Sequence, residues 1–190
     1  PENAAERIYY TVPDNKEPII AIAKDKEATG SQVTVYYKHK PMTKELKATI
    51  AGIAGIYLKS VTSMMLNDRL KEISEKPNAP FMSAYSYDAN FIVSKTMDAF
   101  TTMAVSKEGE TQKALKALLQ ETERVNRFGF TESEYERAKA NLLSMIESMY
   151  KEREKQKNNS YVEEYVSHFT DGGSICGIET DYMLLNKVAA

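Results

Sequence analysis

The sequence is poor in the side chains from which most metal and catalytic centres are built. Its 190 residues include one cysteine, Cys176, and two histidines, His39 and His168. A single cysteine excludes a disulfide within the chain but does not identify the compartment, because disulfide-free domains also occur in oxidising spaces. A zinc site needs three or four ligands at workable spacing, so two histidines far apart in sequence argue against one in this chain.

Two further absences limit the classes of partner. Acidic and basic residues nearly balance, with 27 Asp and Glu against 25 Lys and Arg and a net charge of -2, so a nucleic-acid partner is not expected. No apolar run approaches the ~20 residues that cross a bilayer, and no signal peptide is recognisable. Because the chain starts with Pro1 and stops at Ala190 within a helical pattern, we expect a piece of a longer protein that could still be exported.

Catalytic motifs are missing as well. Neither His-x-x-Glu-His nor His-Glu-x-x-His occurs, and there is no glycine-rich phosphate loop. The stretch from Gly173 to Gly177 differs from the Gly-x-Ser-x-Gly nucleophile turn, because Cys176 stands two residues after Ser174. We expect a simple turn there. A self-contained enzyme that uses Cys176 with His168 as its base remains an alternative interpretation.

What the sequence does contain is a succession of alternating and helical hydrophobic patterns. We predict a linker or extended arm over residues 1–18, followed by a single domain over residues 19–190. Because strands and helices do not alternate singly, the predicted fold class is α+β, an antiparallel-rich mixed sheet with helices layered on one face. Alternation predicts strands at residues 19–24, 32–38, 81–88 and 98–107, and the helical period predicts helices at 43–75, with a bend near Asn67, and at 111–128, 131–156, 160–169 and 178–188.

The same patterns assign side chains to faces. Phe81, Tyr85 and Tyr87 would share one face of their strand, either as part of a buried core or as a binding surface. Gly52 and Gly55 lie inside the long helix, where we expect them to permit close packing against a sheet. The inward residues predicted for helix 111–128 are Leu115, Leu118, Leu119, Thr122 and Val125, and those for helix 131–156 are Tyr135, Ala138, Leu142, Met145, Ile146 and Met149.

One stretch joins a helix end to a helix start. Gly129 can take the left-handed conformation that ends a helix, and Thr131 with Glu134 has the spacing of a capping box. This stretch resembles a helical segment in the non-catalytic domains of the pitrilysin/insulinase family of zinc metallopeptidases, through Gly129-Phe130-Thr131-Glu132-Ser133-Glu134 and then Glu136-Arg137-Ala138-Lys139-Ala140-Asn141-Leu142-Leu143. Residues 65–73 with Pro80-Phe81, 162–169 and 177–182 resemble further motifs of the same family in the same order, with Cys176 where proline is expected.

The resemblance implies a domain that follows the catalytic one in long bacterial members. Such a domain buttresses the zinc domain and walls part of a chamber that encloses peptides. No catalytic or metal-binding residue can be carried over, so zinc is expected in the parent's catalytic domain and no cofactor in this chain. The implied partners are the catalytic domain of the same chain and a peptide or unfolded polypeptide substrate. The implied compartment is the periplasm or cell envelope of a bacterium.

Within that family two functions stay open. The parent is either an active zinc peptidase or a catalytically inactive member that acts as a structural or assembly subunit, and a His-x-x-Glu-His motif upstream of Pro1 would distinguish them. If the domain touches substrate, we expect the strand from Phe81 to Tyr87 to do so, with Tyr85 and Tyr87 as wall residues. Arg69 could meet a peptide carboxylate, although a surface ion pair with Glu72 or Glu75 is the simpler expectation.

Overall fold

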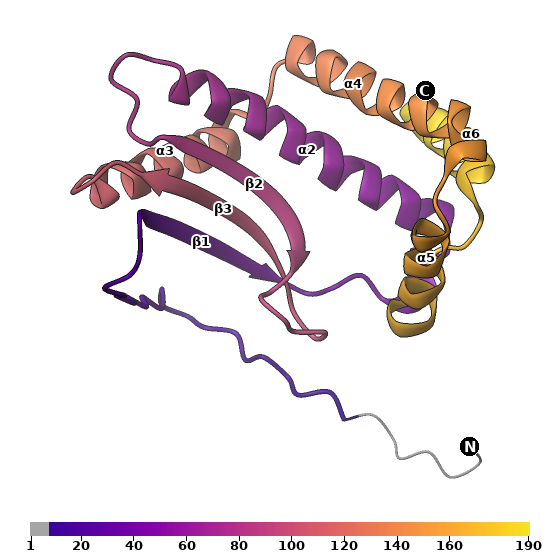
Figure 1. Ribbon diagram of the computed structural model, residues 1–190, viewed down its shortest axis with the longest axis horizontal. Coiled ribbons are helices and arrows are strands. Elements are labelled where there is room, and N and C mark those ends of the chain that lie inside the picture. The colour runs from indigo at the N-terminus through magenta and orange to yellow at the C-terminus, as the bar shows by residue number, and fades with distance from the viewer. Residues whose placement is uncertain (1–7) are drawn as a thin grey trace. The chain divides into compact units, whose positions relative to one another are not determined.

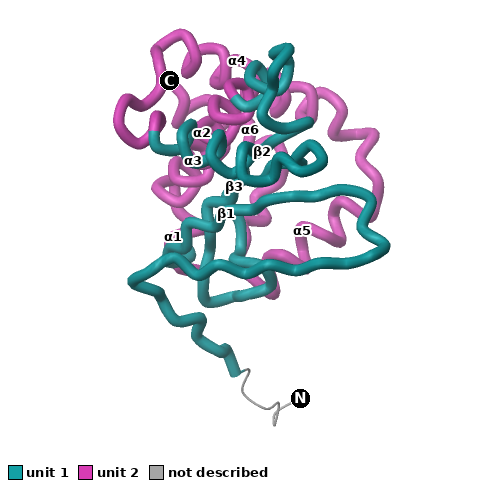
Figure 2. Tube along the Cα trace, turned by 90° about the vertical axis from the view of Figure 1, so that its left-hand side faces the viewer, with its two compact units in different colours: residues 1–41, 70–123 teal, residues 42–69, 124–190 magenta. Residues whose placement is uncertain are grey.

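The computed structural model describes residues 8–190 and has the predicted α+β class, with a three-stranded sheet and helices. It divides into two compact units, which Figure 2 distinguishes by colour: unit 1 comprises Pro1–Pro41 and Leu70–Glu123, and unit 2 comprises Met42–Arg69 and Arg124–Ala190. The first seven residues of the predicted N-terminal arm lie outside the described residues. Residues 8–18 of that arm contain neither helix nor strand.

The sheet of unit 1 is antiparallel throughout. It consists of β1 (Ser31–His39), β2 (Ser83–Asn90) and β3 (Asp98–Ser106), with β3 in the centre (Figure 1). The strand predicted at residues 19–24 does not form, and its isoleucine side chains are exposed. Alternation alone was misleading there, because a strand also needs a neighbour to accept its backbone hydrogen bonds.

The two faces of this sheet differ. Helix α3 (Thr111–Phe128) contacts one face, where the hydroxyls of Tyr37 and Thr122 lie 3.1 Å apart. The register places Ser86 and Thr102 on that face, and both are buried. The inward residues of α3 are Ala114, Leu118 and Glu121, whereas Leu119 is exposed, so the predicted inward position of Leu119 was wrong. Positions 114, 118 and 121 follow the helical period closely, and position 119 is turned away from them.

Unit 2 is helical. Its elements are α1 (Lys44–Lys47), α2 (Ile50–Ser74) as far as Arg69, α4 (Glu132–Lys151), the 3-10 turn η1 (Arg153–Lys155), α5 (Asn158–Asp171) and α6 (Ile178–Ala189). One buried cluster joins three of these helices, through Tyr57, Val61 and Met65 of α2, Ala138 and Leu142 of α4 and Ala189 of α6. Met145 and Met149 of α4, which were predicted to point inward, are exposed.

The long helix is interrupted near its start and not near Asn67. Thr43 caps α1, and a turn at Ala48 and Thr49 then leads into α2. A Cβ atom at Gly52 would lie 2.1 Å from the carbonyl oxygen of Leu46. Gly52 therefore permits the backbone of α1 to approach α2, and the predicted packing against a sheet is not its explanation.

The later helices also differ in their bounds from the prediction. Helix α4 ends at Lys151, five residues before the predicted end, and η1 follows it. Helix α5 begins at Asn158, two residues before the predicted start, and has no side-chain cap. Gly172, at a φ of 70°, ends α5, and the segment up to Gly177 is irregular with a bend at Cys176.

Candidate functional site

The sheet face opposite α3 carries an exposed group of tyrosines, which we call the tyrosine face: Tyr36 on β1 with Tyr85 and Tyr87 on β2. These side chains are 41%, 43% and 37% exposed, respectively. The register places Tyr85 opposite Met103 and both Tyr36 and Tyr87 opposite Thr101, so all three lie on the same face, on the two strands that flank the central one. The face is apolar in its rings and polar at its hydroxyls, a combination that suits contact with another molecule.

Contacts among these rings hold the face in place. The rings of Tyr85 and Tyr87 stack with centroids 6.0 Å apart, and the hydroxyl of Tyr85 donates to the sulfur of Met103 at 3.1 Å. Tyr36 meets Phe91 edge to face at 5.2 Å. These contacts preorganise the surface. Because a tyrosine side chain has only two rotatable bonds, it also loses little conformational entropy when another molecule binds.

Phe81 does not belong to the tyrosine face. It precedes β2 and its side chain is fully buried, at 0% exposure. The prediction placed Phe81 on one strand with Tyr85 and Tyr87, but β2 begins only at Ser83. Phe81 is a core residue of unit 1.

An extended segment of the chain itself is held beside this part of unit 1. Lys38, which shares its sheet face with Tyr36, donates from Nζ to the carbonyl of Pro13 at 2.7 Å. The hydroxyl of Thr96 donates to the carbonyl of Tyr10 at 2.9 Å, and the backbone N–H of Val12 donates to the same hydroxyl at 3.3 Å. These bonds hold an extended chain through its main-chain groups.

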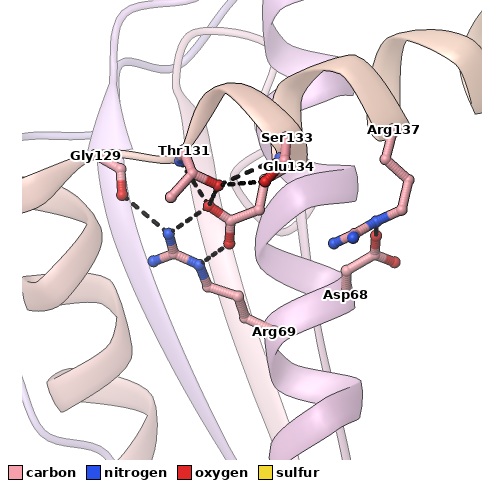
Figure 3. A network of polar contacts seen from close by, with 7 residues as sticks. All are labelled: Asp68, Arg69, Gly129, Thr131, Ser133, Glu134 and Arg137. Carbon is pink, nitrogen blue, oxygen red and sulfur yellow. Dashed lines mark hydrogen bonds and ion pairs between the residues drawn. The ribbon is translucent and has the colours of Figure 1, made fainter.

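Arg69 lies on α2 in unit 2, and its side chain contacts the first turn of α4 (Figure 3). Its guanidinium donates to both carboxylate oxygens of Glu134 and to the carbonyl of Gly129 at 3.1 Å, and it lies 4.7 Å from the ring centroid of Phe130. Glu134 also accepts from the backbone N–H of Thr131 at 2.7 Å, which completes the predicted capping box. The hydrogen bonds from Arg69, with those from Thr131, lower the pKa of Glu134 from 4.5 to about 2.

This geometry gives Arg69 a structural role. The sequence predicts a partner one turn away on the same helix, but Glu134 is 65 residues further along the chain. Contact of Arg69 with a substrate carboxylate stays a prediction. The guanidinium is already paired with a carboxylate, and its side chain is only 12% exposed.

The Cys176 and His168 alternative gains no support from the local geometry. Cys176 is exposed, and its backbone N–H donates to the hydroxyl of Ser174 at 3.3 Å. His168 Nδ1 lies 2.6 Å from the carbonyl of Gly173, so that nitrogen carries a proton and donates it. Ser174 lies in an irregular segment between α5 and α6 and not in a strand-to-helix elbow.

Sequence reasoning missed one cluster of chemically active side chains. His39, Asp88 and Asp98 each place one ligand atom within 4.8 Å of the others, at one end of the sheet. Their separation along the chain hid them, since His39 and Asp88 are 49 positions apart. Within residues 8–190, no helix is long and apolar enough to span a membrane.

Comparison with known proteins identifies relatives at the level of sequence. A family described as the peptidase M16 inactive domain matches residues 2–142. A "Zinc protease PQQL-like" protein of Arabidopsis thaliana is 29% identical over 175 residues, which is 92% of this chain but 15% of that protein. The chain thus spans less than a sixth of the length of this relative.

Solved structures share the fold. The periplasmic protease PqqL from Escherichia coli superposes with a TM-score of 0.73 at 15% identity, over 86% of this chain and 18% of that one. A predicted insulinase family protease from Yersinia pestis gives 0.70 at 9% identity, over 86% of this chain and 34% of that one. The inactive peptidase domain of a putative zinc protease from Bordetella parapertussis superposes with a TM-score of 0.52 at 14% identity, over 85% of this chain and 80% of that one.

Proposed function

Because this chain belongs to the peptidase M16 family, as its inactive domain, we propose that it is the non-catalytic domain of a zinc-dependent metallopeptidase that hydrolyses peptides. In this proposal it supports the catalytic domain of the same chain and walls part of the substrate chamber. The lack of His-x-x-Glu-His in its sequence agrees with a supporting role. The observation that carries the chamber-wall role is the tyrosine face.

A chamber that accepts varied peptides needs contacts that do not depend on sequence. Tyrosine rings offer apolar area at a low cost in conformational entropy, and their hydroxyls can bond to any peptide carbonyl. β1 and β2 flank β3, so each has an outer edge to which an extended peptide can add. The side chains of Lys38 and Thr96 bind the arm from Tyr10 to Pro13 through its main-chain carbonyls, which supports sequence-independent binding of an extended chain beside this sheet.

We restrict the proposed contact residues to Tyr85 and Tyr87, with Tyr36 beside them. Phe81 is buried, and Arg69 is paired with Glu134. The proposed partners are a peptide or unfolded polypeptide and the catalytic domain, which would hold the zinc. A bacterial periplasm or cell envelope is the proposed compartment, supported by the likeness to a protease described as periplasmic.

The test is the double variant Tyr85→Ala with Tyr87→Ala in the full-length parent. We expect KM for peptides to rise severalfold with little change in kcat, because the lost contacts are the same in the ground and transition states. Tyr161→Ala is the matched control, since Tyr161 is as exposed but lies on α5 in unit 2.

Two results would count against the proposal. Unchanged KM in a folded double variant would show that the tyrosine face does not touch substrate. A parent that lacks both His-x-x-Glu-His and chelator-sensitive peptidase activity would instead be a structural or assembly subunit.

A further inference from the structure

Termini of all three strands lie together at one end of the sheet in unit 1. His39 ends β1, Asp98 begins β3, and Asp88 lies two residues before the end of β2. The register pairs Asp98 with both His39 and Asn90, so these residues share one sheet face, and Asp88 shares it because Asp88 and Asn90 are two positions apart. The side chains of Asp88 and His39 are 11% and 32% exposed, and Asp98 is 9% exposed.

The hydrogen bonds of His39 leave one ring nitrogen facing a carboxylate. Nδ1 lies 2.9 Å from the carbonyl oxygen of Lys40, which can only accept, so Nδ1 carries a proton. In the neutral ring Nε2 then has a lone pair, and it lies 3.0 Å from Oδ2 of Asp88. Two acceptors at this distance need a cation between or beside them, either a proton or a metal ion.

We propose that His39, Asp88 and Asp98 bind one divalent transition-metal ion of the Zn²⁺ class. Nε2 of His39 and one carboxylate oxygen from each aspartate would be the ligands, with water completing the coordination. Imidazole favours Zn²⁺ over Mg²⁺ or Ca²⁺, which prefer all-oxygen sites. The proposal is independent of the proposed peptidase role.

The distances fit such an ion after a small adjustment. The ligand atoms lie within 4.8 Å of one another. In a tetrahedral site, two ligand atoms that are each about 2.1 Å from the ion lie roughly 3.4 Å apart, so a pair at the outer limit must close by roughly 1.4 Å. Rotation of a carboxylate about its terminal torsion supplies a movement of this size.

The surroundings resemble those of ligands in known metal sites. Ligating histidines commonly donate the other ring N–H to a backbone carbonyl, as His39 does to Lys40. Ligating carboxylates are commonly hydrogen-bonded in turn, and Asn90 Nδ2 donates to Oδ1 of Asp98 at 2.9 Å. Asn90 is thus a positioning residue. An ion bound here would cross-link the ends of β1, β2 and β3.

The experiment is a titration of ZnCl₂ into the chain after a chelator has removed any bound metal. Calorimetry and ¹⁵N NMR of the histidine rings monitor the titration. The chain has only two histidines, so each ring can be assigned. We expect one equivalent of Zn²⁺ to bind, with a large shift of His39 Nε2 and no comparable shift in His168. The thermal midpoint should rise with Zn²⁺, because an ion that binds only the folded state stabilises it.

Variants then locate the ligands. His39→Gln and Asp98→Asn should each weaken Zn²⁺ binding by more than about 10-fold, and Asn90→Ala by about 10- to 100-fold. His168→Gln and Cys176→Ser should bind as the unchanged chain does. Circular dichroism in chelator confirms that each variant folds without metal.

Three outcomes would overturn the proposal. They are the absence of saturable Zn²⁺ binding, undiminished binding by His39→Gln, and a Zn²⁺-dependent shift at His168 in place of His39. The NMR result on the unchanged chain decides the matter even if a variant fails to fold. If saturable binding is absent and both nitrogens of His39 keep their protons throughout the titration, the His39–Asp88 contact is an ion pair and not a metal site.

Discussion

At the scale of single residues, the Glu134 carboxylate does two things at once. It closes the capping box at the start of α4 and accepts the guanidinium of Arg69. Its pKa falls to about 2 in the folded protein, mainly because Arg69 hydrogen-bonds to the charged form. The unfolded chain therefore takes up a proton near pH 4.5 while the folded chain does not. The stabilisation that comes from the lowered pKa of Glu134 is fully present above about pH 5 and is lost as pH falls towards 2.

Replacing Glu134 with Gln should reveal this contribution. Gln can keep the capping box but cannot pair with Arg69 as a charge. We expect Glu134→Gln to lower the free energy of unfolding at pH 7 by at most about 3 kcal/mol, as the pKa change implies. Urea denaturation at several pH values measures this, and the difference from the unchanged chain should shrink between pH 5 and 2.

The matched control is Glu132→Gln, which removes the same charge from an exposed position in the first turn of α4. Its effect should stay within about 0.5 kcal/mol, as for other surface substitutions. Equal effects of the two variants would mean that the Arg69 ion pair contributes nothing beyond the charge near the helix start.

At the scale of elements, two neighbouring leucines show which side of α3 faces the sheet. Leu118 is 1% exposed and Leu119 is 43% exposed. We expect Leu118→Ala to lower the free energy of unfolding by about 2–5 kcal/mol, because it removes buried methyl groups and leaves a cavity. Leu119→Ala should cost less than about 1 kcal/mol. Chemical denaturation of both variants tests the orientation, and similar losses would show that α3 packs differently.

At the scale of the whole molecule, the chain should not hydrolyse peptides by itself. It lacks His-x-x-Glu-His, and it spans only 15% of the length of its Arabidopsis relative. A quenched fluorescent peptide should therefore stay intact with this chain, with or without added Zn²⁺, and be cleaved by an active full-length parent. Turnover by the chain alone that a chelator abolishes would contradict the proposed non-catalytic role.

Local chemistry was readable from the sequence because it depends on residues a few positions apart. The capping box needs only Thr131 and Glu134, and the left-handed helix end needs only Gly129, whose φ is 65°. The periodicity of the helices and of β2 and β3 is similarly local, and both the α+β class and the family resemblance were confirmed. Isolated alternation was insufficient at residues 19–24, where no neighbouring strand pairs with the segment.

Tertiary structure alone decided which side chains meet and which faces are covered. Phe81 and Tyr85 are four positions apart and would share one face of a continuous strand. Phe81 is nevertheless buried and Tyr85 exposed, and β2 begins between them. Antiparallel pairing on both sides of β3 brings His39 and Asp88 to Asp98, and helix packing brings Glu134 to Arg69 across 65 residues. Such contacts depend on strand order and on packing, which a local pattern of hydrophobic residues does not encode.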